Sequence, residues 1–78
     1  MPTLVRQNGF QVMIHTDDHR PAHVHCYRDG RLVAVRLSDL SVVKLRRASR
    51  RDISDALQIV AEHHDRLAQA WREIHGEE

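Results

Sequence analysis

Hydrophobic and polar residues alternate along the first half of the chain in the pattern of paired β-strands. Alternating runs at 4–7 and 10–14 flank Asn8-Gly9, and runs at 23–28 and 31–37 flank Asp29-Gly30. Such a pair between two strand-like runs favours a hairpin with a two-residue type I′ turn. We therefore predict two β-hairpins joined by a loop over 16–22, which gives a sheet of four strands, or of five if Val42–Leu45 forms another.

A two-residue turn also fixes which side chains share a face of the sheet. In the second predicted hairpin Cys26 lies opposite Val33 and Val24 opposite Val35, so this face is predicted to form the core. Cys26 is then a buried, unreactive thiol. The other face is half polar and carries five candidate functional residues: His15, His23, His25, Tyr27 and Arg36.

The last third of the chain has the apolar periodicity of one long helix over 49–75. Its apolar positions recur at the spacing of a helix face: Ala56, Leu57, Val60, Leu67, Trp71 and Ile74. Ser49 with Asp52 favours a capping box at the start, and Gly76 favours termination. The fold class expected is α+β, with the sheet over 1–46 and the helix on one face of it, in a single domain over 1–78.

Such a helix is longer than its predicted sheet. About 26 residues of helix span roughly 39 Å, whereas strands of this length span about 17–23 Å. The C-terminal half is thus expected to leave an apolar stripe for another chain, either a second copy or a small cognate protein. The interface candidates are His64, Leu67, Trp71 and Ile74. The alternative is that the helix bends or that the sheet is wider.

Composition indicates a small protein of the cytoplasm. The chain has 78 residues and one cysteine, so no internal disulfide can form. No secretory leader and no membrane-spanning run is evident. The net charge of +1 hides a basic segment at 44–51. Its arginines are candidates for contact with nucleic-acid phosphate: Arg46, Arg47, Arg50 and Arg51. The alternative is ordinary surface pairing, such as Arg51 with Asp55.

Four of the seven histidines fall within residues 15–25, which makes this segment the centre of any chemistry. His23 and His25 point to one side of a strand and form a candidate site for a divalent metal such as zinc. The third ligand would come from His15, His19, Asp17 or Asp18. The favoured interpretation is a hydrogen-bonded polar surface, with no cofactor expected; a metal-independent ribonuclease site built on His23, His25, Tyr27 and Arg36 is a further alternative.

Several motifs taken together resemble a known family. The chain begins Met1-Pro2-Thr3, contains His19-Arg-Pro-Ala-His23-Val-His25, and continues with Glu62-His63 and Ala70-Trp71. This resembles the domain-of-unknown-function family 4160 of small bacterial proteins. The chain differs at Ala22, where the family commonly has a second proline. The resemblance implies a gene context of the toxin–antitoxin type, beside a second small protein.

The leading functional interpretation is a small protein-interaction module, one component of a toxin–antitoxin-like pair, rather than an enzyme. It would act through the polar sheet face and the overhanging helix. The alternatives are the metal-independent ribonuclease toxin and a module that binds a metal weakly.

Overall fold

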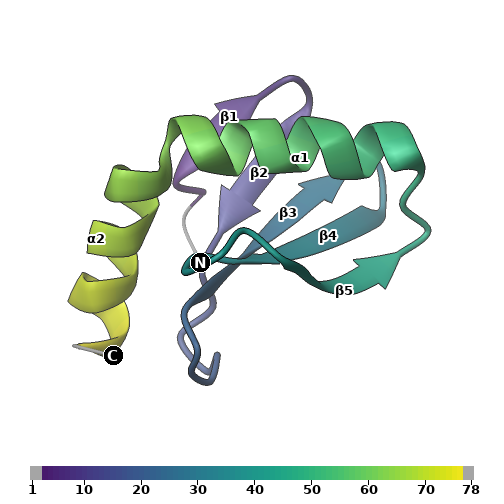
Figure 1. The fold of residues 1–78 in the computed structure, drawn as a ribbon. Helices are drawn as coiled ribbons and strands as arrows, with labels where there is room; N and C mark the ends of the chain where they lie inside the picture. The colour runs from purple at the N-terminus through teal and green to yellow at the C-terminus, as the bar shows by residue number, and fades with distance from the viewer. Residues whose placement is uncertain (1–2, 77–78) are drawn as a thin grey trace.

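In the computed structural model, which describes residues 3–76, one antiparallel sheet has one helix across a face and a second helix beside its end (Figure 1). The predicted α+β class and both predicted hairpins are therefore confirmed, and of the two strand counts left open, four or five, the structure has five. The strands are β1 (Val5–Gln7), β2 (Phe10–Met13), β3 (His23–Arg28), β4 (Arg31–Arg36) and β5 (Val42–Arg46). The helices are α1 (Arg50–Glu62) and α2 (His64–His75).

The strands follow one another across the sheet in chain order, and every neighbouring pair is antiparallel. Both tight turns are of the predicted kind, because Asn8, Gly9, Asp29 and Gly30 all have φ between 51° and 79°. The β3–β4 register is also as predicted, with Cys26 opposite Val33 and His25 opposite Ala34.

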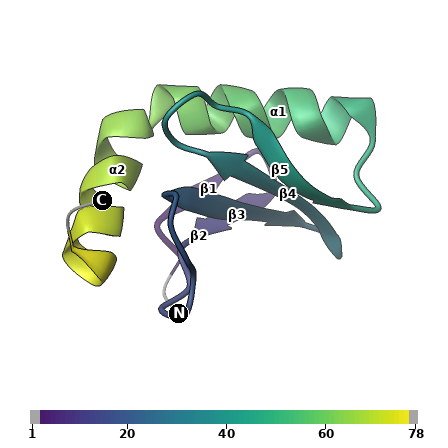
Figure 2. The same ribbon diagram turned by 60° about the horizontal axis from the view of Figure 1, so that its bottom comes forward.

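The core lies between the sheet and α1, which crosses over one face of it (Figure 2). The inward positions of the strands are fully buried, among them Val12, Val24, Cys26, Val33 and Val35. The helix meets them with Ala56, Ile59 and Val60. α1 begins with the predicted capping box, since Ser49 and Asp52 each accept a hydrogen bond from the other's backbone N–H.

The predicted single helix over 49–75 is wrong, because the helix breaks at His63. His63 has φ −111° and ψ 20°, outside the helical range. Side chains around the break are held by β1 and by the loop after β4. Gln7 Nε2 donates to Glu62 at 2.8 Å, and His63 Nε2 donates to Gln7 at 2.9 Å. His64 donates to the Leu37 carbonyl. Each of the two helices is about 20 Å long, which matches the length of the six-residue strands β3 and β4.

The break turns α2 down past the end of the sheet instead of letting it run on (Figure 1). A straight helix of roughly 39 Å would exceed the longest dimension of the molecule, 32 Å. Leu67 and Trp71 are buried by their own chain, so the predicted uncovered stripe is wrong for these two residues. Of the four interface candidates, Ile74 is the exposed one at 36%, and His64 is partly buried.

Arg28 ties the sheet to the start of α1. It lies on the core face at the end of β3, with its guanidinium 4.1 Å from the Phe10 ring centre. Nη2 donates to Asp52 at 2.6 Å and to Asp55 at 3.1 Å, and Nη1 donates to the Asn8 carbonyl at 2.9 Å. A charge at this edge of the core is tolerated because it is paired and hydrogen-bonded.

None of the helices in residues 3–76 is both long and apolar enough to cross a membrane.

We predict that Trp71 is a main source of stability. Trp71→Ala is expected to lower the free energy of unfolding by about 3–5 kcal/mol, because it leaves a large cavity in the core. Ile74→Ala, on the same helix, is expected to cost under about 1 kcal/mol. Urea denaturation followed by circular dichroism measures both values. Equal losses would show that α2 is not packed as described.

We also predict that acid weakens the fold through Asp52. Its hydrogen bonds from Ser49 and then from Arg28 lower the pKa of this carboxyl from 3.8 to about 2. The stability it contributes is therefore complete above about pH 4 and is lost as the pH falls toward 2. Asp52→Asn should flatten the dependence of unfolding free energy on pH in this window. Asp65→Asn, at an exposed site, should leave the wild-type slope unchanged.

Candidate functional site

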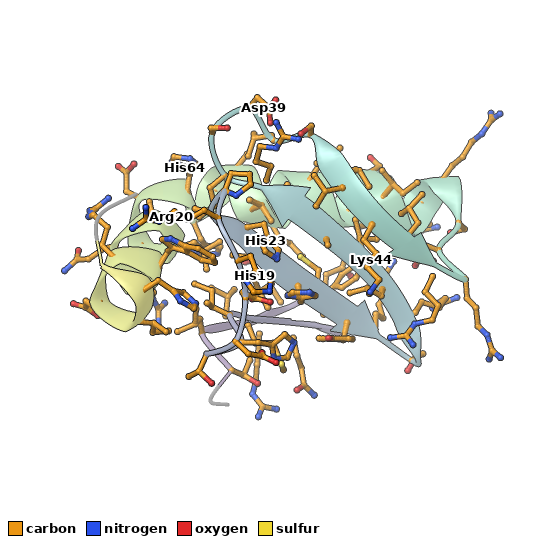
Figure 3. The ribbon with its side chains drawn as sticks, turned by 90° about the horizontal axis from the view of Figure 1, so that it is seen from below. His19, Arg20, His23, Asp39, Lys44 and His64 are labelled. Atoms are coloured by element: carbon orange, nitrogen blue, oxygen red, sulfur yellow. The ribbon has the colours of Figure 1, made fainter. Side chains whose placement is uncertain are left out.

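The face of the sheet opposite α1 is hollowed into a groove of about 440 Å³. Figure 3 views this face, with α1 behind the sheet and the loop that carries His19 and Arg20 running over one end. The groove is lined by Asp17, Asp18, His19, Arg20, Pro21, His23, His25, Ala34, Arg36, Val43 and Lys44.

Strand pairing determines how these side chains lie. His25 on β3 is opposite Ala34 on β4, which is opposite Lys44 on β5. Because paired residues project to the same face, the small Ala34 side chain forms a floor between His25 and Lys44. His23 is likewise opposite Arg36. The groove thus has histidines on one side and cations on the other.

Three groups with metal-ligating atoms converge at the histidine side. One ligand atom from each of Asp18, His23 and His25 lies within 4.8 Å of the other two. His23 Nε2 is 3.6 Å from Asp18 Oδ1, and His25 Nδ1 is 3.5 Å from Asp18 Oδ2. The three side chains are only 11–19% exposed. They form a compact set of two imidazoles and one carboxylate.

The loop before β3 orients Asp18 and His23. Asp18 Oδ2 accepts the backbone N–H of His15 at 2.9 Å, which fixes the carboxylate in its turn. His23 Nδ1 lies 2.9 Å from the Pro21 carbonyl oxygen. A carbonyl oxygen only accepts, so Nδ1 carries the proton. In the neutral ring, Nε2 then presents a lone pair toward Asp18.

His25 contributes a buried nitrogen that lacks a hydrogen bond. Among residues 3–76 its Nδ1 has no hydrogen-bond partner, although Asp18 Oδ2 lies 3.5 Å away. Burial lowers the pKa of His25 below 6.5, against the opposing effect of Asp18, so the ring is neutral at pH 7. An unpartnered buried polar atom is unfavourable unless another group binds it.

His15 and Tyr27 form a second contact beside the three ligands. His15 Nε2 and the Tyr27 hydroxyl are 3.0 Å apart, and the His15 and His25 ring centres are 4.5 Å apart. Burial raises the pKa of Tyr27, so its hydroxyl stays protonated at neutral pH. His15, a predicted metal candidate, is thus held by Tyr27, while Asp18 stands beside His23 and His25.

The C-terminal helix packs against the loop of this site. The Trp71 ring centre lies 5.6 Å from that of His23 and 4.1 Å from that of His75. His75 Nε2 donates to the His15 carbonyl at 2.9 Å. α2 therefore packs against the loop that borders one end of the groove.

The structure does not bring the basic candidates at 46–51 into the groove. Arg46 lies on the same face of the sheet as Lys44, whereas Arg50 and Arg51 are in the first turn of α1. Arg51 Nε is 3.9 Å from Asp55, as its spacing suggested.

Cys26 is fully buried on the core face, and burial raises the pKa of its thiol to about 12, so it is neither ligand nor nucleophile.

Sequence reasoning named the two central histidines and left the third ligand open. It did not single out Ala34 or Lys44 as part of the groove. The register already paired His25 with Ala34, so extending the sheet to the fifth strand would have placed Lys44 beside them. The position of Asp18 carried no such signal, because it depends on the path of the loop.

The fold and groove define a small α+β protein with a histidine-rich site on the exposed face of its sheet. A family model described as Domain of unknown function (DUF4160) matches residues 9–72. The chain therefore belongs to this family, as its motifs indicated. Neither the curated proteins nor the solved structures contain a match to the chain.

Proposed function

We propose that the protein is a metal-binding module whose Asp18, His23 and His25 hold one divalent transition metal. The observation that carries the proposal is the convergence of their three ligand atoms within 4.8 Å. Ligands about 2.0–2.1 Å from a tetrahedral zinc ion lie roughly 3.3 Å apart. His23 Nε2 lies 3.6 Å from Asp18 Oδ1 and His25 Nδ1 lies 3.5 Å from Oδ2, so the two carboxylate oxygens each approach one imidazole, and the triplet would contract from 4.8 Å to close around an ion.

The surroundings of the ligands support the same proposal. His23 donates its other ring N–H to a backbone carbonyl, the usual arrangement for a ligating imidazole. The free nitrogen of His25 would gain its missing partner. Two histidines and one carboxylate leave further positions open toward the groove. Sites with three protein ligands are typical of metals that also bind a water or a substrate.

Zinc titration of protein purified without a histidine tag tests this proposal. We expect one zinc per chain by calorimetry, and a tetrahedral absorption spectrum with Co²⁺. His23→Ala, His25→Ala and Asp18→Asn should each weaken binding at least about tenfold, because each removes a ligand.

His19→Ala is the matched control, since His19 lines the same groove from the same loop but stands outside the triplet. It should bind zinc as the wild type does. Wild-type protein that takes up no zinc would overturn the proposal. If His19→Ala alone lost zinc binding, His19 would be a ligand and the proposed triplet would be wrong.

A second proposed function is the partner-binding component of a toxin–antitoxin-like pair, favoured by the free edge of β5. Within residues 3–76 this strand pairs only with β4, and its Val43 and Leu45 are 44% and 49% exposed. An exposed strand edge is a template for an added strand. A second copy laid antiparallel on β5 would bring Lys44 and Arg46 against the same cations, which is unfavourable. The partner expected is therefore an acidic strand of another protein.

Co-expression with the product of the adjacent gene tests this second function. We expect an equimolar complex in size-exclusion chromatography. Leu45→Glu should weaken it about tenfold or more, because the substitution places a charge in the apolar edge and repels an acidic partner. Ile74→Glu makes the same change at an exposed position on α2 and should have no effect. Absence of a complex, or equal loss in both variants, would contradict the β5 interface.

A further inference from the structure

We infer that the groove binds the phosphodiester backbone of a single-stranded nucleic acid, with one phosphate between the metal and Lys44. The inference rests on the proposed metal site and adds the class of ligand that this site takes. It is carried by the cations, the small Ala34 side chain at the floor and the aromatic ring on the same face of the sheet.

The cations face the metal ligands across the groove. Lys44 is exposed and has no ion-pair partner among residues 3–76. Arg36 is opposite His23, and its only carboxylate neighbour in that range is Asp39 at 3.7 Å. A metal held by one carboxylate and two neutral imidazoles keeps a positive charge. The open side of the groove would therefore attract an anion, with Lys44 and Arg36 on one wall and the metal on the other outweighing the exposed Asp17.

The floor between these walls is the smallest side chain of the row, Ala34, which is itself only 1% exposed. His25 and Lys44 are two strands apart, about 10 Å between backbones. Ala34 lies between them and reaches only one carbon above the sheet. A larger side chain at this position would fill the space that the ligand needs. A phosphate oxygen bound to the metal could then accept a hydrogen bond from the Lys44 ammonium group.

The features along the strands indicate a polymer and not an isolated phosphate. Lys44 and Arg46 project to the same face two residues apart, about 6.6–6.8 Å along the strand. Arg46 is opposite Leu32, which is opposite Tyr27. The Tyr27 ring is stacked with the His25 ring at an interplanar angle of 11°. Successive phosphates would meet successive cations, and an unpaired base would meet an aromatic ring. A duplex would hide its base faces from this ring.

Fluorescence anisotropy with labelled eight-nucleotide RNA and DNA strands tests the inference on the full chain. The zinc-loaded protein should bind at least about tenfold more tightly than the metal-free protein, because the metal supplies one of the phosphate contacts. RNA and DNA strands of the same sequence identify which of the two the groove prefers. Affinity should fall with added salt, because phosphate contacts release counterions.

Two variants test oligonucleotide binding independently of zinc binding. Lys44→Glu and Ala34→Leu should each weaken oligonucleotide binding about tenfold or more, by reversing a charge and by filling the floor. Zinc affinity in both variants should stay within about twofold of the wild type, since neither residue is a ligand. Lys44 is exposed, so the first variant serves even if Ala34→Leu fails to fold. Arg66→Glu, on exposed α2 surface outside the groove, makes the same charge change and should bind normally.

Each other outcome rejects a stated part of the proposal. Zinc binding without oligonucleotide binding overturns this inference and leaves the metal module intact. Oligonucleotide binding without zinc overturns the metal site and the placement of the phosphate. Equal losses in Arg66→Glu and Lys44→Glu would show diffuse attraction to a basic surface. Effective competition by polyglutamate at the same concentration of charge would assign the groove to an acidic peptide.

Discussion

The arrangement of this protein depends on the two-residue turn at Asp29-Gly30. The turn sets the β3–β4 register, and the register decides which side chains meet the helix and which meet the groove. A slip of one residue would exchange the faces, placing His23 and His25 in the core and Val24 and Cys26 outside. Both turn residues have positive φ, which favours the aspartate–glycine sequence found there.

The small size of the core imposes the second constraint. A chain of this length has few apolar residues with which to close a core. One straight helix would leave Leu67 and Trp71 beyond the end of the sheet. The break at His63 returns both side chains to the core, and hydrogen bonds from the sheet and its loops hold the residues around the break. The same turn of the chain brings α2 against the loop that carries Asp18.

Local patterns predicted the sheet well because each signal was short in range. Two Xaa-Gly turns and an alternating pattern sufficed to place His25 opposite Ala34, which is the pairing that the sheet adopts. The helix break had no such signal. No glycine or proline lies near His63, and the apolar periodicity continues through it. Its cause is non-local, since Gln7 and Leu37 reach His63 and His64 from the sheet and its loops.

The same distinction applies to the site. Side chains on strands, such as His23 and Arg36, could be assigned to a common face from the register alone. Asp18 could not, because its carboxylate is placed by a hydrogen bond to the His15 backbone within an irregular loop. Sequence spacing therefore offered four possible partners for the histidine pair and no means to choose between them. The partners of Arg28, Asp52 and Asp55, likewise had no local signal, because they lie 24 and 27 residues further along the chain.

Because α2 contacts the loop that carries Asp18, the stability of α2 and the stability of this loop depend on each other. His75 holds the His15 carbonyl, and Trp71 lies against His23. Fraying of the last helix therefore removes support from a histidine of the groove. Conversely, anything that binds only the ordered loop raises the free energy needed to open α2, by an amount that grows with its concentration relative to Kd. Hydrogen exchange in the C-terminal helix is thus a remote reporter of occupancy in the groove.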